Sequence, residues 1–266
     1  LNAEAVGDAI SSIEHIEPAE RRRVEYFSRQ IIDMFSPSNF LGTNPEALER
    51  AVETEGESLV KGLENLVADI EANEGDLLVT LADRDAFKIG ENLATTPGRV
   101  VFQNKLFELL QYDASTDAVQ KTPILIFPPW INKFYILDLK AKNSLIKWLV
   151  DQGHTVFVVS WVNPDDSYAD ISMLDYVELG YEAAIADVKK KALAKKINVV
   201  GYCIAGTTLA LTLARRAKRG STDDINSATF FTTLTDFSDQ GEVCVFLNND
   251  FVNCIYAECQ DKLLLE

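Results

Sequence analysis

The chain has 266 residues, 47% of them hydrophobic, which is enough to bury one large core or two smaller ones. With 41 acidic and 25 basic residues, its net charge is -16, and this acidity argues against general nucleic-acid binding. The sequence contains no run of about 18 apolar residues, so it predicts no transmembrane segment. It also does not begin with a basic segment followed by an apolar one, so it does not predict secretion. We therefore expect no nucleic-acid partner and no transmembrane segment.

The cysteines and histidines are too few and too scattered to predict a metal site. Cys244, Cys254 and Cys259 lie near the end of the chain without a C-x-x-C pair, and the sequence has only two histidines. Free thiols in an intracellular protein are the simplest interpretation. The chain also begins at Leu1 rather than methionine and ends while an α/β pattern continues, so we expect a fragment of a longer protein.

The first 110 residues have a mostly helical, amphipathic pattern. Residues 17–20 open one expected helix, and residues 43–46 offer a cap with a proline near the first helical position. A further helix is indicated by apolar residues at helical spacing, namely Leu59, Leu63, Leu66 and Ile70. Residues 95–98 predict a turn and residues 100–102 a short strand.

A polar stretch at residues 112–121 separates this part from the rest. We therefore predict a mostly helical N-terminal domain at residues 1–119 and a second domain at residues 120–266. In the second part short apolar strands alternate with helices, which predicts a parallel sheet covered on both faces. The expected strands are residues 123–127, 155–161, 197–200 and 228–231, and the expected helices are residues 143–150, 174–194 and 210–219. The predicted fold class is α/β, with a helical N-terminal domain followed by an α/β core that is cut off early.

Residues 197–206 organise this core. They predict a buried strand, a sharp turn that carries Cys203, and a helix, which is the order of the nucleophile elbow usually written G-x-S-x-G. Gly201 allows the tight turn, and Ala205 and Gly206 allow helix and strand to approach closely. The cysteine then stands at the positive end of the helix, where a thiolate is favoured. The alternative is an inert thiol, because an isolated free cysteine is most often a small buried hydrophobe.

The loop at residues 128–133 follows the first strand of this core. In α/β-hydrolases this loop supplies one oxyanion-hole N–H, and the residue after the nucleophile supplies the other. The loop begins with two prolines, which have no N–H. The hole would therefore combine the N–H of Ile204 with that of Trp130 or Ile131. The alternative is a rigid packed loop.

A nucleophilic cysteine on this fold needs a base, in the chain order nucleophile, Asp, His, and no histidine follows Cys203. His154 precedes the strand at residues 155–161, so we place it at the opposite edge of the sheet, about 20 Å away, in a structural role. His15 is expected in the acidic N-terminal helix, without catalytic context. The chain therefore lacks its general base.

Three other features have two interpretations each. Residues 160–165 either line the pocket or form a capped turn. The basic residues 215–219 either meet coenzyme phosphates or, as we favour, stabilise a helix end through its dipole. Asp236 and Asp239 follow the last expected strand, but neither is assigned as a triad acid.

In order along the chain, these motifs resemble those of the class I poly(3-hydroxyalkanoate) synthases, the poly-beta-hydroxybutyrate polymerases. The matching segments are residues 43–48, 92–98, 128–139, 153–157, 160–165, 201–203 and 228–234. An ordered series of this kind is highly specific, and it extends over residues 40–247. The tail at residues 248–266 departs from the family pattern.

The resemblance implies a helical N-terminal domain followed by an incomplete α/β-hydrolase core, so that residues 120–266 are a truncated α/β-hydrolase catalytic domain. It implies an acyltransferase that polymerises (R)-3-hydroxyacyl-CoA into polyhydroxyalkanoate with release of CoA, using no metal or redox cofactor. It implies that Cys203 holds the growing chain as a thioester and that Ile131 and Ile204 provide the oxyanion-hole N–H groups. It also implies a cytoplasmic protein at the surface of the nascent polyester granule, a homodimer when full length. Ala205 departs from the family box G-x-C-x-G-G, where we expect the extra methyl to be tolerated. The family's catalytic Asp and His, which lie further downstream, are absent.

A cysteine suits this chemistry, because acyl transfer from CoA sulfur to cysteine sulfur is nearly isoenergetic and keeps the chain activated. We expect the full-length form to be the acyltransferase and this chain alone to be inactive. Two alternatives stay open: a cysteine hydrolase of small esters or lactones on the same fold, and a non-catalytic dimerisation or granule-surface module.

Overall fold

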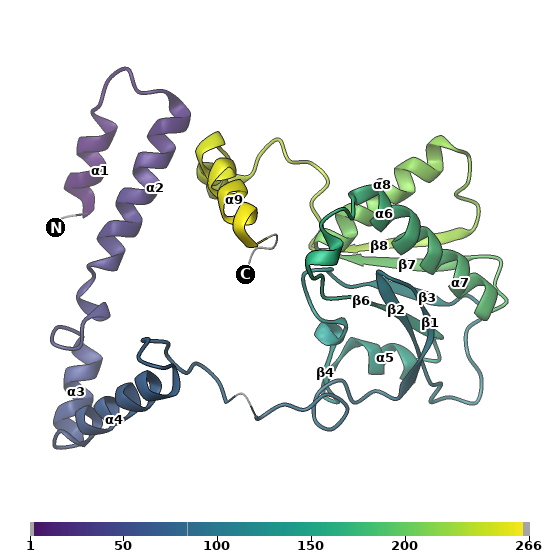
Figure 1. Ribbon diagram of the computed structural model, residues 1–266, viewed down its shortest axis with the longest axis horizontal. Coiled ribbons are helices and arrows are strands. Elements are labelled where there is room, and N and C mark those ends of the chain that lie inside the picture. The colour runs from purple at the N-terminus through teal and green to yellow at the C-terminus, as the bar shows by residue number, and fades with distance from the viewer. Residues whose placement is uncertain (1–2, 84, 263–266) are drawn as a thin grey trace. The chain divides into compact units, whose positions relative to one another are not determined.

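The computed structural model describes residues 3–83 and 85–262, with the side chains of residues 6–83 and 85–258. The chain divides into two compact units. The helical unit is formed by the residues before position 84 together with Asp239–Tyr256, and the sheet unit is formed by Asp85–Ser238 with the described residues after Tyr256. Figure 1 shows the helices of the first unit and the sheet of the second.

The helical unit begins with the helices that the sequence predicts. Asn44 caps one of them by accepting hydrogen bonds from the backbone N–H groups of Glu46 and Ala47, with Pro45 at the first helical position. The helices are α1 (Ala3–Ser11), α2 (Pro18–Met34), α3 (Pro45–Glu53) and α4 (Glu57–Ala72), followed much later by η5 (Gly241–Phe246) and the start of α9 (Asn249–Lys262). The predicted cap and helices are confirmed.

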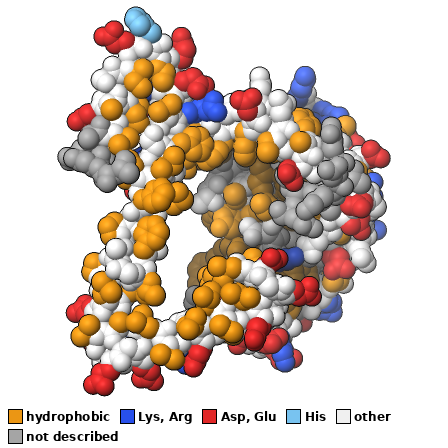
Figure 2. Space-filling view, turned by 60° about the vertical axis from the view of Figure 1, so that its left-hand side comes forward, with side chains coloured by type: hydrophobic (Ala, Val, Ile, Leu, Met, Phe, Trp, Pro, Cys, Tyr) orange, Lys and Arg blue, Asp and Glu red, His pale blue; other side chains and the backbone are white. Residues whose placement is uncertain are grey.

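Few of the described side chains of this unit are buried. None of the residues of α2, α3 or α4 is buried. Among the described residues of the unit, the buried hydrophobic side chains are Ile10 and Val245. Phe246 packs edge-on against Tyr26 and Phe27 of α2, with ring centroids 5.5 and 5.8 Å apart. The helices therefore expose much of their apolar surface, which Figure 2 shows as hydrophobic side chains along them.

The sheet unit contains a six-stranded sheet in the order β1-β2-β6-β3-β7-β8. Its four strands β6, β3, β7 and β8 are parallel, whereas β1 and β2 are antiparallel to their neighbours. The strands are β1 (Gly98–Gln103), β2 (Phe107–Tyr112), β3 (Ile124–Phe127), β6 (Val156–Trp161), β7 (Ile197–Tyr202) and β8 (Ile225–Phe231), with a small hairpin of β4 (Asp138–Lys140) and β5 (Asn143–Ser144).

Helices cover both faces of the sheet, and β3 is buried along its whole length between them. One core cluster joins Leu125 and Phe127 to Tyr181 and Leu209, and the other joins Ile126 to Ile146 and Val150. The helical segments are α5 (Leu145–Asp151), α6 (Met173–Asp175), the π-helical η4 (Tyr176–Glu182), α7 (Ala183–Lys191) and α8 (Ile204–Lys218). The predicted α/β class, with an incomplete hydrolase-type core, is confirmed.

The structure differs from the sequence-based expectation at several places. The strand predicted at residues 100–102 is confirmed as part of β1. Residues 107–112 form β2 and join the sheet, where a mostly helical pattern was expected to about Leu110; the side chains of Phe107 and Leu109 are buried at strand spacing. Ser144 ends β5 and caps α5, so that helix begins two residues later than expected. The start of the sheet unit at Asp85 also precedes the domain boundary predicted at residues 119/120.

No helix in the described part of the chain is long and apolar enough to cross a membrane.

Candidate active site

Cys203 is the single residue between the end of β7 and the start of α8. Its φ of 55° and ψ of -127° are unusual for a residue with a side chain. Three hydrogen bonds hold it there: its N–H donates to the Phe231 carbonyl at 2.9 Å, and its carbonyl accepts from the N–H groups of Gly206 at 2.8 Å and Thr207 at 3.2 Å. The thiol is exposed and free. The chain thus makes an elbow that presents a sulfur to solvent.

Two glycines make this elbow sterically possible. A methyl group on Gly201 would lie 2.6 Å from the Cα atom of Gly206. A methyl group on Gly206 would lie 1.9 Å from the Oγ1 atom of Thr233. Ala205, in contrast, is fully buried within the core cluster and its methyl is accommodated there. The departure at Ala205 therefore fits the fold.

The loop after β3 leaves the sheet beside the elbow. Phe127 and Gly201 pair in parallel register, so the loop at residues 128–133 and the elbow emerge from neighbouring strands at the same edge. The indole N–H of Trp161 donates to the Pro128 carbonyl at 2.8 Å, and the loop is also tied to the end of β6 by an ammonium-to-amide bond of 2.9 Å from Lys133 to Asn163. Two side-chain bonds therefore fix this loop to the last residue of β6 and to the segment just after it.

The two predicted oxyanion donors belong to these two segments. Ile204 is the first residue of α8, so its N–H has no acceptor within the helix. Ile131 lies in the loop with its side chain 77% exposed. The structure thus brings Cys203, Ile204 and the Ile131 loop to one edge of the sheet.

An aromatic cluster that the sequence analysis missed packs behind this edge. The ring of Tyr176 lies 5.7 Å from those of Trp130 and Trp161, and Tyr181 stacks on Phe127 at 4.2 Å. Both tyrosines belong to η4, whose π-helical turn places residues five apart on one side. The five-residue spacing of the tyrosines is the sequence signal that could have revealed this turn.

Of the two histidines, His154 belongs to the sheet unit that contains the elbow. His154 lies two residues before β6, which runs parallel to β3 and thus to β7, so it stands at the edge opposite Cys203, as predicted. His15 is exposed in the turn between α1 and α2 with a φ of 65°. The expectation that His15 lies within a helix is wrong, because the chain reverses direction there.

The segment at residues 160–165 supplies a capped turn and a loop contact. The Asp165 carboxylate accepts the backbone N–H of Ser167 at 2.9 Å. Hydrogen bonds from the side chain and backbone of Ser167 hold the pKa of Asp165 below its ordinary value. The capped-turn interpretation therefore accounts for Asp165. The side chain of Asn163 instead accepts the hydrogen bond from Lys133 of the loop after β3.

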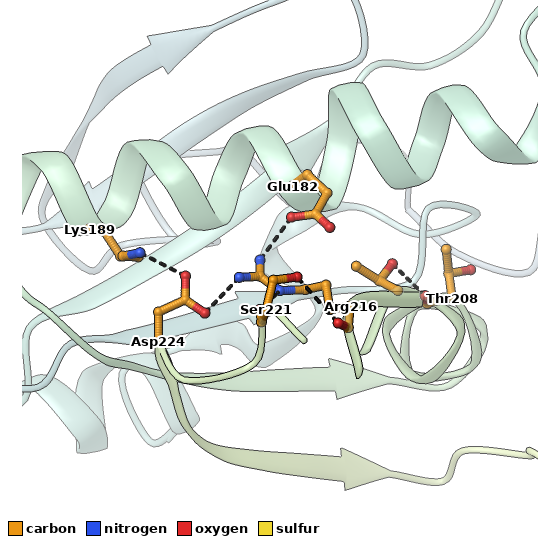
Figure 3. Close-up of polar contacts among 7 residues, drawn as sticks. Glu182, Lys189, Thr208, Arg216, Ser221 and Asp224 are labelled. Atoms are coloured by element: carbon orange, nitrogen blue, oxygen red, sulfur yellow. Dashed lines mark hydrogen bonds and ion pairs between the residues drawn. The ribbon is translucent and has the colours of Figure 1, made fainter. Parts of the chain in front are cut away.

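The basic end of α8 is occupied by ion pairs. Arg216 is 7% exposed and contacts Glu182 at 2.8 Å and Asp224 at 2.6 Å, as Figure 3 shows. Its Nε atom also donates to the Ser221 carbonyl at 2.9 Å. Arg215 pairs with a further carboxylate on η4. These two arginines are therefore engaged in packing, which leaves the coenzyme-phosphate interpretation without support from either.

The remaining acidic candidates cap turns. Asp236 and Asp239 each accept a backbone N–H from two residues further on, at 2.9 Å. Among the residues that the structure describes, no group of three or more His, Cys, Asp or Glu side chains could hold a metal ion.

A parallel sheet whose strand β7 turns through an exposed, strained cysteine into the helix α8 defines a protein with an α/β-hydrolase-type fold. The family described as "Poly-beta-hydroxybutyrate polymerase (PhaC) N-terminus" matches residues 1–149, more than half of the chain. The chain belongs to this poly-beta-hydroxybutyrate polymerase family.

Curated relatives agree with this assignment. The chain is 44% identical to the poly(3-hydroxyalkanoate) polymerase subunit PhaC of Rhizobium meliloti over 97% of its length and 42% of the relative's. It is 44% identical to the poly(3-hydroxyalkanoate) polymerase of Methylorubrum extorquens over 97% of its length and 43% of the relative's. For the PhaC subunit of Cupriavidus necator the values are 42%, 95% and 42%. The chain thus spans about two fifths of the length of these relatives.

Solved structures resemble parts of the chain only distantly. Fungal esterases from Rhizomucor miehei match with 14% identity and a TM-score of 0.40, covering 65% of this chain and 52% of theirs. An α/β-hydrolase from a lagoon-sediment metagenome matches with 13% identity and a TM-score of 0.35, covering 62% and 61%. With scores this low, these likenesses carry no conclusion about this chain.

Proposed function

We propose that this chain is part of an acyltransferase that polymerises (R)-3-hydroxyacyl-CoA into polyhydroxyalkanoate, with Cys203 as the nucleophile. The exposed thiol of Cys203 at the elbow is the observation that carries the proposal. The relatives named poly(3-hydroxyalkanoate) polymerases support the substrate class. The substrate itself brings the activated acyl group, and the proposal includes no metal or redox cofactor.

In the proposed reaction, the Cys203 thiolate attacks the thioester carbonyl of the acyl-CoA. The oxyanion that forms is stabilised by the N–H groups of Ile204 and Ile131. The bond from carbonyl carbon to CoA sulfur breaks, and CoA leaves as a thiolate that takes up a proton. The 3-hydroxyl of the next monomer then loses its proton to a base and attacks the enzyme thioester. The bond from the acyl carbon to the Cys203 sulfur breaks, the Cys203 thiolate is released, and the chain is longer by one ester bond.

The base for that second step is missing from these 266 residues, because no histidine follows Cys203. We therefore propose that this chain alone accepts one acyl group but does not turn over. Incubation with (R)-3-hydroxybutyryl-CoA should release at most one CoA per chain, with the acyl group on the Cys203 peptide. Cys203→Ala should abolish the release, whereas Cys254→Ala, at another exposed free cysteine, should not change it.

Three results would count against this proposal. Sustained CoA release would contradict the missing base. Acylation of Cys254 as fast as that of Cys203 would contradict the assignment of the nucleophile, and cleavage of p-nitrophenyl esters over many turnovers would favour a cysteine hydrolase.

We further propose that the helical unit contacts the surface of the polyester granule in the cytoplasm. The support is the apolar surface of α4, where Val60, Leu63 and Val67 are 60%, 61% and 46% exposed. Val60→Glu with Leu63→Glu should weaken sedimentation of the chain with purified granules, whereas Glu71→Gln on the same helix should not. Unchanged sedimentation of the double variant would contradict the contact. The full-length form is also proposed to be a homodimer, which sedimentation velocity of that form tests.

A further inference from the structure

Tyr181 is fully buried against the nucleophile elbow, and its hydroxyl is bonded to the elbow backbone. Its ring packs against those of Phe127, at 4.2 Å, and Trp161, at 5.6 Å. The hydroxyl donates a hydrogen bond of 2.8 Å to the carbonyl oxygen of Ala205, in the first turn of α8. Burial raises the pKa of this phenol above its ordinary value, so it stays protonated and remains a donor.

Two peptide groups connect this hydroxyl to the proposed oxyanion hole. The Ala205 carbonyl shares a peptide group with the Gly206 N–H, and that N–H donates to the Cys203 carbonyl at 2.8 Å. The Cys203 carbonyl in turn shares a peptide group with the Ile204 N–H. A peptide that accepts a hydrogen bond at its oxygen becomes a stronger donor at its N–H, so the bonds of such a chain reinforce one another.

We propose that Tyr181 is a positioning residue for acyl transfer, whose hydroxyl sets the orientation and donor strength of the Ile204 N–H through this chain of hydrogen bonds. The inference rests on the proposed function, because it concerns the oxyanion hole of the Cys203 nucleophile. Because Cys203 has a positive φ, the backbone is strained where α8 begins. Neighbouring groups must therefore hold the peptide between Cys203 and Ile204 in place. Tyr181 supplies that support from a ring that the aromatic cluster holds in place.

The expected effect is small and measurable. A whole oxyanion-hole donor is worth about 10²–10³ in rate. Reinforcement along a chain of hydrogen bonds changes each bond by about 10–30%. Loss of the Tyr181 hydroxyl should therefore slow a reaction that forms an oxyanion by about two- to eightfold.

The experiment compares two reactions of Cys203 in the whole 266-residue chain, at about pH 8.5, where a cysteine ionises without a base. With p-nitrophenyl acetate, the thiolate attacks the ester carbonyl, whose oxygen becomes an oxyanion. The C–O bond then breaks and p-nitrophenolate leaves, while the thiol proton has gone to solvent. With iodoacetamide, the thiolate displaces iodide and no oxyanion forms. Peptide mass spectrometry follows both products at Cys203.

Tyr181→Phe should slow acetylation about two- to eightfold and leave alkylation unchanged. Tyr112→Phe is the matched control: Tyr112 is a buried tyrosine of β2 whose hydroxyl has no hydrogen-bond partner in the described part of the chain. This control should change neither rate. If Tyr181→Phe does not fold, 3-fluorotyrosine at position 181 keeps the ring and strengthens the donor, so acetylation should rise.

Three results would overturn the inference. Unchanged acetylation in Tyr181→Phe, or in the fluorotyrosine variant where Tyr181→Phe does not fold, removes the link between the hydroxyl and the oxyanion hole. An equal loss in both reactions shows a merely structural role. Acetylation of Cys203 no faster than that of Cys254 in the unmodified chain removes the proposed nucleophile, and the inference fails with it. Selective acetylation of Cys203 that is insensitive to Tyr181 leaves the proposed function intact and overturns this inference alone.

Discussion

Gly206 is a residue at which the elbow has no space for a side chain. The position that its Cβ would occupy lies 1.9 Å from the Oγ1 atom and 2.9 Å from the Cβ atom of Thr233, which follows β8. The Cα atom of Gly206 also leaves no room for a side chain at Gly201. The close approach of strand, helix and the residues after β8 is what keeps Cys203 in its strained conformation.

Gly206→Ala should lower the free energy of unfolding by about 3 kcal/mol, at the upper end of overpacking costs. Urea denaturation followed by circular dichroism measures this change. Gly62→Ala on α4, where a methyl group meets nothing within 4 Å, should not lower stability. Thr233→Ala should restore part of the loss in Gly206→Ala, because it removes the nearest atom. Equal stability of Gly206→Ala and the unmodified chain would contradict the steric account.

Arg216 joins three elements of the sheet unit. From α8 it reaches Glu182 at the end of η4 and Asp224 in the turn before β8, and Lys189 of α7 also pairs with Asp224 at 2.7 Å (Figure 3). A buried guanidinium is tolerated only when its charge and hydrogen-bonding groups are matched. These contacts join α8, η4 and α7 to one another and to the turn before β8.

Asp224→Asn should lower the free energy of unfolding by about 2 kcal/mol at neutral pH. Burial raises the pKa of Asp224, but Lys189 and Arg216 outweigh it and hold the pKa below its ordinary value. A carboxyl with a lowered folded-state pKa contributes stability above its unfolded pKa of about 3.9 and loses it as the pH falls through the folded value. The difference between variant and unmodified chain should therefore shrink below about pH 4.

Urea denaturation at several pH values measures this difference. Asp223→Asn is the matched control, because Asp223 is the exposed neighbour of Asp224. It should change stability by less than about 0.5 kcal/mol. A difference for Asp224→Asn that persists undiminished in acid would show that its charge is not responsible.

Trp161 joins β6 to the loop after β3 through its bond to the Pro128 carbonyl. Trp161→Phe should cost about 2 kcal/mol, because it leaves a buried carbonyl unpaired and removes ring area. Thermal or urea unfolding measures the loss. Trp148→Phe on α5, where the ring is 56% exposed, is the control and should be nearly neutral. Equal effects of the two substitutions would show that the loop does not depend on this bond.

The two units of the molecule differ in how much of their surface they bury. The strands β3, β6 and β7 are almost wholly buried, whereas α2, α3 and α4 contain no buried residue. Because stability against local opening follows burial, the two units should open with different free energies.

Hydrogen exchange measured by mass spectrometry should show this difference directly. Amides of α2 to α4 should exchange at least about 100-fold faster than those of β3, β6 and β7. The two sets are compared within one sample, so each serves as the reference for the other. Equal protection would mean that the helices are stabilised by contacts other than those described.

Much of the fold and the centre of the candidate site could be predicted from local patterns. The apolar runs that became β3, β6 and β7 and the small residues around Cys203 predict their structure from neighbours a few positions away. The Asn44 cap is local in the same way. The absence of a histidine after Cys203 is likewise visible in the sequence alone.

The tertiary structure decided which distant residues meet. It placed β2 beside β6, bonded the Tyr181 hydroxyl to Ala205, and gave Arg216 its carboxylate partners. The sequence by itself determined the strands, the helices and the chemical groups that each carries, because these depend on residues close together in the chain. Contacts between distant segments depend on which strands pair and on which buried polar groups become hydrogen-bond partners. Both are decided only when the chain folds.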